Sequence, residues 1–361
     1  MTNFQEQTSY LIPTLGVKEL YMRRCLQLAN YGSGYVAPNP MVGAVLVYED
    51  TIIGEGYHLR YGEAHAEPIA INAVKNPELL KQSTLYVSLE PCSFYGKTPP
   101  CADLIVSSGI PRVVIGTIDP NPKVAGRGIE ILRKAGIEVT VGVLEDDCRE
   151  LNKRFFIFQE QKRPYVLLKW AQTQDGFMDR IRTDNTEPPL QISNEITKQL
   201  THKMRSENQA ILVGANTVLL DNPSLTVRNW SGKTPIRIAI DRQGRIPYNF
   251  NLMDGSLPTL IFTEKEKVNK QHLKFVKIDF DSDFIKTILN EIYKRNIHSV
   301  MIEGGATILN RFIEAGLWDE ANIEVSPQRI IEGVSAPLLP LQPIIRKSFE
   351  GHEWLFFKNN T

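Results

Sequence analysis

The sequence predicts a two-domain α/β protein whose first domain is a three-layer sandwich. The chain has 361 residues, of which 42% are hydrophobic and 23% are charged, an ordinary composition for a globular protein. At roughly 150 residues per domain, this length predicts two domains with well-filled cores. Apolar strand segments alternate with helical segments in both halves, and this alternation is typical of helices packed on a central sheet.

The first half gives the elements of one such sandwich. We expect a loose arm over residues 1–16, a helix over 17–30, and two strands over 41–48 and 51–57 that form a hairpin. The expected elements then alternate, helix before strand, along the rest of the half. They cover residues 66–74, 84–89, 102–106, 112–118, 128–135 and 138–143.

A charged stretch that ends at Pro164 predicts a boundary between the two halves. We therefore expect a domain over residues 17–150, a linker over 151–163 and a second domain over 164–361. In the second domain, helices are expected where apolar residues recur with helical spacing, over residues 193–206, 284–295 and 308–315. Strands are expected over residues 165–170, 210–214, 235–240, 258–263, 299–302, 319–325 and 353–358.

A short motif in the first half predicts a zinc site. His65, Cys92 and Cys101 offer one nitrogen and two sulfur ligands, the usual set for a catalytic Zn²⁺ that keeps its fourth position for water. Glu67, two residues after the histidine, is the proton carrier that such a site needs. Any one of these residues alone is more often a core residue. All of them in this order, with Pro91 before Cys92, match the pattern of zinc nucleobase deaminases, except that eight residues separate the cysteines instead of two.

Charge and cysteine content narrow the function classes. The formal net charge is zero, so nothing in the overall balance predicts a basic face for a nucleic acid. Cys25 and Cys148 lie near no other ligand and are expected in the core. Because unpaired thiols fit a reducing compartment, and because we find neither a membrane-spanning apolar run nor a signal peptide, we expect a cytoplasmic protein without a membrane contact.

The first half resembles the bifunctional riboflavin-biosynthesis deaminase–reductase family, in its cytidine-deaminase-like domain. The long gap between the two cysteines is a feature of this family. The resemblance implies zinc bound by His65, Cys92 and Cys101, with Glu67 as the proton carrier. The segments that carry it are residues 37–43 (APNPMVG), 54–58 (GEGYH), 62–67 (GEAHAE), 89–93 (LEPCS), 96–101 (GKTPPC) and 119–128 (DPNPKVAGRG).

Other polar residues near the motif have two interpretations each. Asn39 and His58 are either hydrogen-bonding partners of a pyrimidine ring or polar residues that close a loop, and we weigh these equally. Lys97, Lys123 and Arg127 lie in loops within reach of a ribose phosphate, although a single such residue is more often a solvated surface charge.

The second half resembles the dihydrofolate-reductase-like reductase domain of the same family. The carrying segments are residues 168–169 (LK), 175–176 (DG), 214–218 (GANTV), 221–228 (DNPSLTVR), 235–238 (PIRI) and 303–305 (EGG). The resemblance implies NADPH as the cofactor. By position it places a first group of residues at the cofactor: Gln172, Thr217, Asp221, Gly305, Ala306 and Thr307. It places a second group at the substrate: Arg205, Leu225, Arg228 and Glu303.

Four further features of these domains have a specific interpretation. Lys169, at a strand end, is either a proton donor near the hydride acceptor or an exposed lysine. The Gly304-Gly305 turn is either a pyrophosphate-binding turn at a helix start or a tight turn only. Two positions depart from the family: Pro68 replaces an apolar residue and suits a first helical turn, and Gln191 replaces a tryptophan, so we expect a differently shaped loop there.

The resemblance implies a two-step enzyme of riboflavin synthesis. It deaminates a diaminohydroxypyrimidine that carries a phosphoribosylamino group, then reduces the ribosyl unit to ribityl with NADPH. Two other classes of protein are alternatives. A salvage or tRNA-editing deaminase would need a basic groove or a short Cys-x-x-Cys loop, and the sequence shows neither. A protein with a structural zinc ion would usually have four protein ligands, where we count three, and would not need Glu67. The expected partner is a small-molecule pyrimidine ribosyl phosphate, and base rates favour a homo-oligomer.

Overall fold

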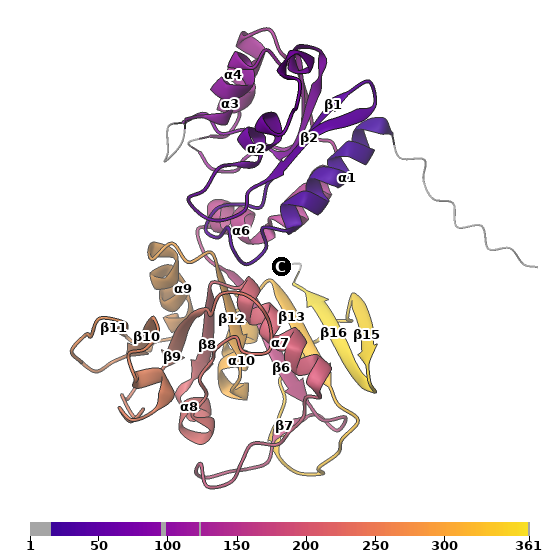
Figure 1. Cartoon of the computed structure of the whole chain (residues 1–361). Coiled ribbons are helices and arrows are strands. Elements are labelled where there is room, and N and C mark those ends of the chain that lie inside the picture. The colour runs from indigo at the N-terminus through magenta and orange to yellow at the C-terminus, as the bar shows by residue number, and fades with distance from the viewer. Residues whose placement is uncertain (1–15, 95–98, 123, 360–361) are drawn as a thin grey trace, which may run out of the picture. The chain divides into compact units, whose positions relative to one another are not determined.

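The computed structural model describes residues 16–94, 99–122 and 124–359. Residue contacts divide the chain into two compact units. One comprises residues 1–32 and 41–151, and the other comprises residues 33–40 and 152–361. Figure 1 shows the elements of each unit. Among the described residues, no helix has both the length and the apolar content needed to cross a membrane.

The first unit is a three-layer sandwich around a five-stranded sheet, as predicted. The sheet order is β2-β1-β3-β4-β5. The hairpin strands β1 and β2 are antiparallel to each other, β1 is antiparallel to β3, and β3, β4 and β5 are parallel. The strands are β1 (Gly43–Tyr48), β2 (Thr51–Tyr57), β3 (Thr84–Leu89), β4 (Arg112–Thr117) and β5 (Glu138–Val141).

Helices cover both faces of this sheet because its strands are apolar on both sides (Figure 1). One core contains Met22 and Cys148, which come from the helices of one face. The other contains Ala70, Ile105 and Leu132, from the helices of the opposite face. The first face carries α1 (Val17–Asn30) and α5 (Glu145–Leu151), and the second carries α2 (Ala66–Asn72), α3 (Cys101–Ser107) and α4 (Arg127–Lys134). A 3₁₀ helix, η1, spans Pro77–Gln82.

The stretch expected as a linker contains a helix, α6 (Lys153–Gln161). Phe155, Phe156 and Phe158 are buried, and burying each such side chain contributes about 1.5–3 kcal/mol. Phe158 stacks on His298, with 3.7 Å between the ring centroids. Helix α6 therefore packs on the second unit through its aromatic residues, while Lys153 pairs with Glu320 and Arg154 lies over the Tyr165 ring.

The second unit contains a nine-stranded sheet in the order β11-β10-β9-β8-β12-β6-β13-β16-β15. The seven strands from β11 to β13 are parallel, and β16 and β15 are antiparallel at one edge. The strands are β6 (Tyr165–Gln172), β8 (Ala210–Gly214), β9 (Ile236–Ile240), β10 (Thr259–Thr263), β11 (Leu273–Lys277), β12 (Ser299–Glu303), β13 (Glu320–Val325), β15 (Ile345–Phe349) and β16 (His352–Lys358). A separate pair joins β7 (Phe177–Asp179) to β14 (Val334–Ser335).

Helices again lie on both faces of this sheet. α9 (Phe284–Lys294) and α10 (Ala306–Glu314) bury Leu289, Leu309 and Phe312 in one core. Two smaller apolar clusters contain side chains from other helices, among them Met204 and Val218. These helices are α7 (Glu195–Glu207), α8 (Ala215–Asp221) and the 3₁₀ helix η2 (Asn251–Met253). In both units, candidate functional residues lie where a strand ends and the chain turns toward a helix.

Candidate active sites

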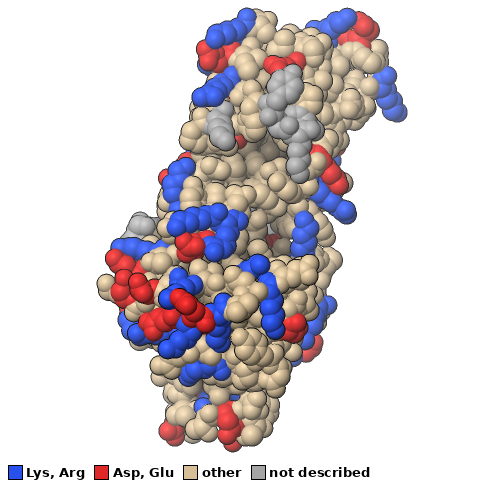
Figure 2. Space-filling model, turned by 90° about the vertical axis from the view of Figure 1, so that its left-hand side faces the viewer, with Lys and Arg blue, Asp and Glu red and all other residues tan. Residues whose placement is uncertain are grey.

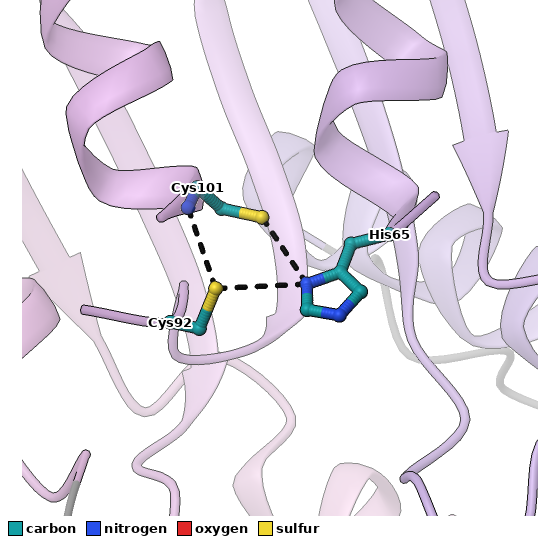
Figure 3. Close-up of side chains that lie close together, drawn as sticks. All are labelled: His65, Cys92 and Cys101. Carbon is teal, nitrogen blue, oxygen red and sulfur yellow. Dashed lines mark hydrogen bonds between the residues drawn. The ribbon is translucent and has the colours of Figure 1, made fainter. Parts of the chain in front are cut away.

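Three predicted zinc ligands converge in the first unit (Figure 3). His65 immediately precedes α2, Cys101 is the first residue of α3, and Cys92 lies three residues after β3 ends. His65 Nδ1 lies 3.3 Å from Cys101 Sγ and 3.6 Å from Cys92 Sγ. The three ligand atoms all lie within 4.8 Å of one another. A tetrahedral zinc ion needs ligand atoms about 3.5–3.8 Å apart, so these residues fit the ion.

The electrostatics of the two thiols also suit a metal. The hydrogen bond from Cys101 lowers the pKa of Cys92 to about 4, and the same interaction raises the pKa of Cys101. The backbone N–H of Cys101 also donates to Cys92 Sγ over 3.3 Å. These contacts favour the thiolate form of Cys92, which is the form that binds zinc.

Glu67 lies in the first turn of α2, two residues after His65, with its side chain buried. Its Oε2 atom has no hydrogen-bond partner among the described residues. Burial raises the pKa of Glu67 to about 7. A buried carboxyl group with one free oxygen beside a metal site is suited to accept and release a proton.

His58 and Asn39, the two residues predicted to contact the pyrimidine, belong to different units of the structure. His58 is buried, and its ring meets that of His65 edge-on, with 5.4 Å between centroids. Its Nδ1–H donates to Ala64 O over 3.0 Å, and burial lowers its pKa, which favours a neutral ring. Asn39 is half-buried in the segment 33–40, whose contacts group it with the second unit. Lys97 and Lys123 lie outside the described residues, and Arg127 is exposed at the start of α4.

A second polar cluster lies in the nine-stranded sheet. Lys169 on β6 is paired in register with Glu303 on β12 and with Asn322 on β13. Lys169 is buried rather than exposed, and that burial lowers its pKa even though the charges of Glu303 and Glu324 oppose the shift. The strand end predicted at Lys169 is wrong, because β6 continues to Gln172. A buried lysine with carboxylates nearby is suited to proton transfer.

Arg205 on α7 fixes Glu303 in this cluster. Its Nε and Nη2 donate to the two carboxylate oxygens of Glu303 over 2.8 and 2.6 Å. Burial is the largest single influence and acts to raise the pKa of Glu303, but the charge and hydrogen bonds of Arg205, together with the charges of Lys169 and His202, lower the pKa overall. Such a two-pronged pair holds both side chains in one orientation.

The predicted substrate loop approaches the same cluster. Arg205 Nη1 donates to Thr226 O over 3.1 Å, and the backbone N–H of Arg228 donates to His202 Nδ1 over 3.1 Å. Leu225 is buried with a left-handed backbone, φ 53°. The structure therefore brings Leu225 and Arg228 to α7, where His202 is a neighbour that the sequence did not single out.

The predicted cofactor residues separate into two groups. Thr217, Gly305 and Thr307 line one cavity of about 760 Å³. Gly305 has φ 74°, and a Cβ there would lie 3.1 Å from Thr217 Oγ1, so a side chain would crowd the cavity wall. Ala306 begins α10 beside them.

The other group lies among residues that do not line this cavity. Asp221 ends α8 and pairs with Arg182, and Gln172 accepts a hydrogen bond of 2.7 Å from Trp170 Nε1. Gln191, in place of the family tryptophan, is exposed, and its carbonyl accepts from Gln328 Nε2 over 2.9 Å.

The cavity contains basic residues that the sequence analysis missed. Arg242, Arg245 and Arg311 line it together with Phe280. Arg242 lies 5.8 Å from the Phe280 ring centroid, and Arg245 Nη2 donates to Asn216 Oδ1 over 2.7 Å. Arg242 and Arg245 flank Gly244 just after β9, and that arginine-glycine turn was the available signal.

Comparisons with known proteins match both units. Residues 164–339 match the RibD C-terminal domain, and residues 16–117 match the cytidine and deoxycytidylate deaminase zinc-binding region. Riboflavin biosynthesis protein RibD of Aquifex aeolicus is 42% identical over 329 residues, which cover 90% of this chain and 91% of that protein. The RibD protein of Bacillus amyloliquefaciens is 43% identical over 332 residues, covering 90% of this chain and 88% of that protein.

A solved structure agrees along nearly the whole chain. It is the diaminohydroxyphosphoribosylaminopyrimidine deaminase/5-amino-6-(5-phosphoribosylamino)uracil reductase of Thermotoga maritima, with a TM-score of 0.85 and 36% identity. The match covers 95% of this chain and 99% of that one. These likenesses confirm the predicted deaminase-like and reductase folds, with zinc and NADPH as cofactors. The chain belongs to the RibD family of riboflavin-biosynthesis proteins, bifunctional enzymes that join a zinc-dependent deaminase to an NADPH-dependent reductase.

Proposed function

We propose that this chain catalyses two consecutive reactions on one pyrimidine. Residues 17–150 hydrolyse the ring amine of 2,5-diamino-6-hydroxy-4-(5-phosphoribosylamino)pyrimidine. Residues 164–361 then reduce the ribosyl group of the product with NADPH, giving 5-amino-6-(5-phosphoribitylamino)uracil. The observation that carries the proposal is the convergence of His65, Cys92 and Cys101 near the buried Glu67, in a chain that also has a reductase unit.

In the deamination, water adds to the ring carbon, ammonia leaves, and a carbonyl group remains. His65, Cys92 and Cys101 would hold the zinc ion, which when bound would supply a water molecule that loses a proton at neutral pH. Glu67 takes a proton from the attacking water and passes it to the departing amine through its free Oε2. His58, whose ring meets that of the ligand His65, hydrogen-bonds the polar edge of the pyrimidine.

In the reduction, the sugar reacts in its open-chain form. NADPH, when bound by the reductase unit, would supply the hydride for C1′, and the protein must provide a proton. Lys169, buried between carboxylates, holds that proton. The Arg205–Glu303 pair orients the sugar, Leu225 packs against it, and the exposed Arg228 guanidinium binds the phosphate.

The variant Glu67→Ala tests the deaminase assignment. We expect deamination to fall by about 100- to 10,000-fold, the usual contribution of a positioned proton carrier, because water then lacks a proton acceptor. Zinc content and reduction of supplied deaminated substrate should not change. The exposed Glu78, changed to alanine, is the matched control. Deamination that survives in Glu67→Ala would contradict the mechanism.

The cavity beside Thr217 and Gly305 holds the adenosine half of NADPH in this proposal. Its arginines offer planar, permanently charged donors for the 2′-phosphate, and Phe280 offers a ring face for the base. Gln172 and Asp221 contact the remainder of the cofactor, and Ala306 with Thr307 presents the start of α10 to its pyrophosphate.

The double variant Arg242→Ala/Arg245→Ala tests this placement by binding alone. Each lost charged contact costs about tenfold in affinity, so the dissociation constant for NADPH should rise while that for NADH stays the same. Cofactor fluorescence measures both constants, and Arg346→Ala on β15 is the control. An equal loss for the two cofactors would contradict a 2′-phosphate site.

The remaining expectations concern the class of partner, the cellular location and the oligomeric state of the protein. Acidic and basic side chains are interspersed on the face drawn in Figure 2, and the net charge is zero, which supports a small-molecule substrate rather than a nucleic acid. We propose a cytoplasmic homo-oligomer, since most oligomers are symmetric assemblies of one chain. Light scattering on the purified protein measures the assembly, and a monomer at micromolar concentration would contradict it.

A further inference from the structure

Glu90 is a buried carboxylate that lies between the end of β3 and the zinc ligand Cys92. Its side chain is 4% exposed. Its backbone N–H donates to Thr117 O, at the end of the neighbouring strand β4, over 3.0 Å. The backbone of Glu90 is therefore held in the sheet, only two residues from the metal site.

The carboxylate of Glu90 accepts hydrogen bonds from both ends of one loop. Oε2 accepts from the backbone N–H of Asp119 over 3.3 Å and from that of Gly126 over 2.9 Å. Oε1 accepts from Gly128 over 2.9 Å and from Ile129 over 3.3 Å. One side chain thus binds the chain where it leaves β4 and where it enters α4.

This arrangement replaces a cap that α4 lacks. The residue before α4 is Gly126, which has no side chain to accept from the first N–H groups of the helix. The same turn is pressed on the zinc-ligand segment, because a Cβ on Gly128 would lie 2.1 Å from Pro91 O. The helix start and the segment that carries Cys92 therefore form one tightly packed body.

The loop fastened in this way carries a second buried carboxyl group, that of Asp119. Its Oδ1 accepts from the backbone N–H of Asn121 over 2.7 Å. Burial, with added repulsion from the charges of Glu90 and Cys92, raises the pKa of Asp119 to about 7. The Glu90 carboxylate therefore holds both the backbone of Asp119 and the start of α4.

We propose that Glu90 is a positioning residue of the deaminase: by holding residues 119–121 and the start of α4 against the segment that carries Cys92, it sets how this loop stands at the deaminase site. Glu90 itself contacts neither zinc nor substrate. Its four acceptor contacts require a carboxylate, since an amide would turn an N–H donor toward two of the backbone N–H groups.

The test compares Glu90→Gln with Glu130→Gln in the full-length zinc enzyme. Glu130 lies on the exposed face of α4, where it forms an ion pair with Lys134. For Glu90→Gln we expect kcat/KM of deamination to fall by about 10- to 100-fold, mostly through a higher KM, because a displaced loop at the site weakens productive binding. Zinc content and reductase activity should match wild type, and Glu130→Gln should match it throughout.

Two results would overturn the proposal. A Glu90→Gln enzyme with lower thermal stability but unchanged kcat and KM would make Glu90 a structural cap only. Loss of zinc would show that Glu90 supports the metal instead of the loop. If Glu90→Gln yields no folded protein, Glu90→Asp replaces it, and wild-type kinetics in that variant would likewise contradict positioning.

The proposal rests on the deaminase function proposed above, and the same assay separates the two. If the wild-type enzyme releases no ammonia from the diaminopyrimidine substrate, the function is wrong. If the wild type releases ammonia and the Glu90 variants do so with unchanged kinetics, only the role of Glu90 is wrong.

Discussion

At the residue scale, the zinc site depends on three side chains whose ligand atoms lie within 4.8 Å of one another. His65, Cys92 and Cys101 each stand at an element boundary, so the fold fixes their backbones before any metal binds. The histidine nitrogen and the two sulfurs already lie at distances that suit a tetrahedral ion. Removing one ligand should therefore cost the metal and leave the fold.

The variant Cys92→Ser measures this directly. We expect zinc affinity to fall by at least about 100-fold, more than the loss of an outer hydrogen bond to a ligand costs, because serine is a poor zinc ligand. Metal analysis after dialysis gives the zinc content. Cys148→Ser is the matched control, a buried free cysteine away from the cluster, and it should keep its zinc. Normal zinc content in Cys92→Ser would contradict the ligand assignment.

The sequence could predict this centre because each residue belongs to a short motif. It could not predict Glu90 or the arginines of the reductase cavity. The partners of Glu90 are backbone N–H groups that lie 29 to 39 residues further along the chain. Because every residue except proline has a backbone N–H group, residue types do not reveal such partners. Arg242 and Arg245 become candidate cofactor contacts only in the folded chain, where the turn after β9 lines the same cavity as Gly305.

At the element scale, helix α6 depends on aromatic packing that includes a titratable ring. His298 is buried against Phe158, and its Nε2 lies 3.1 Å from Asn296 Oδ1. Burial lowers the pKa of His298 to about 4, from an ordinary value of 6.5. The folded protein thus keeps this ring neutral where the unfolded chain would charge it.

This shift predicts a loss of stability in acid. Between pH 6.5 and about 4 the unfolded state binds a proton at His298 and the folded state does not, so the ring's contribution is fully present above this window and is lost as the pH falls. By pH 5 the loss is about 2 kcal/mol. Urea unfolding of wild type and His298→Phe at pH 7 and pH 5 isolates it. The same pH dependence in both proteins would contradict the account.

Elements with strong periodicity were predicted well, and the misses have physical reasons. The short helix α8 was not predicted, because seven residues give too little periodicity. Strand β15 was missed because most of its residues are exposed at the sheet edge. Helix α6 was read as a linker because its charges are as numerous as its buried aromatic residues.

At the scale of the whole molecule, each of the two units carries the candidate catalytic residues for one reaction. The deaminase ligands and Glu67 all lie in the first unit, and Lys169, Arg205 and Glu303 all lie in the second. The sequence predicted this division near residue 150 from composition. It gave no sign that residues 33–40, including Asn39, group with the second unit, since that grouping depends on tertiary contacts alone.

The central claim is that one chain performs both reactions in order, with the product of the first as the substrate of the second. The most direct measurement gives the purified zinc enzyme the diaminopyrimidine phosphoribosyl substrate, with and without NADPH, and follows ammonia release and NADPH absorbance together. We predict ammonia in both cases and NADPH oxidation only after deamination. Ammonia without any NADPH oxidation would contradict the claim, and would leave a deaminase whose reductase unit, with Gln191 in place of tryptophan, is inactive.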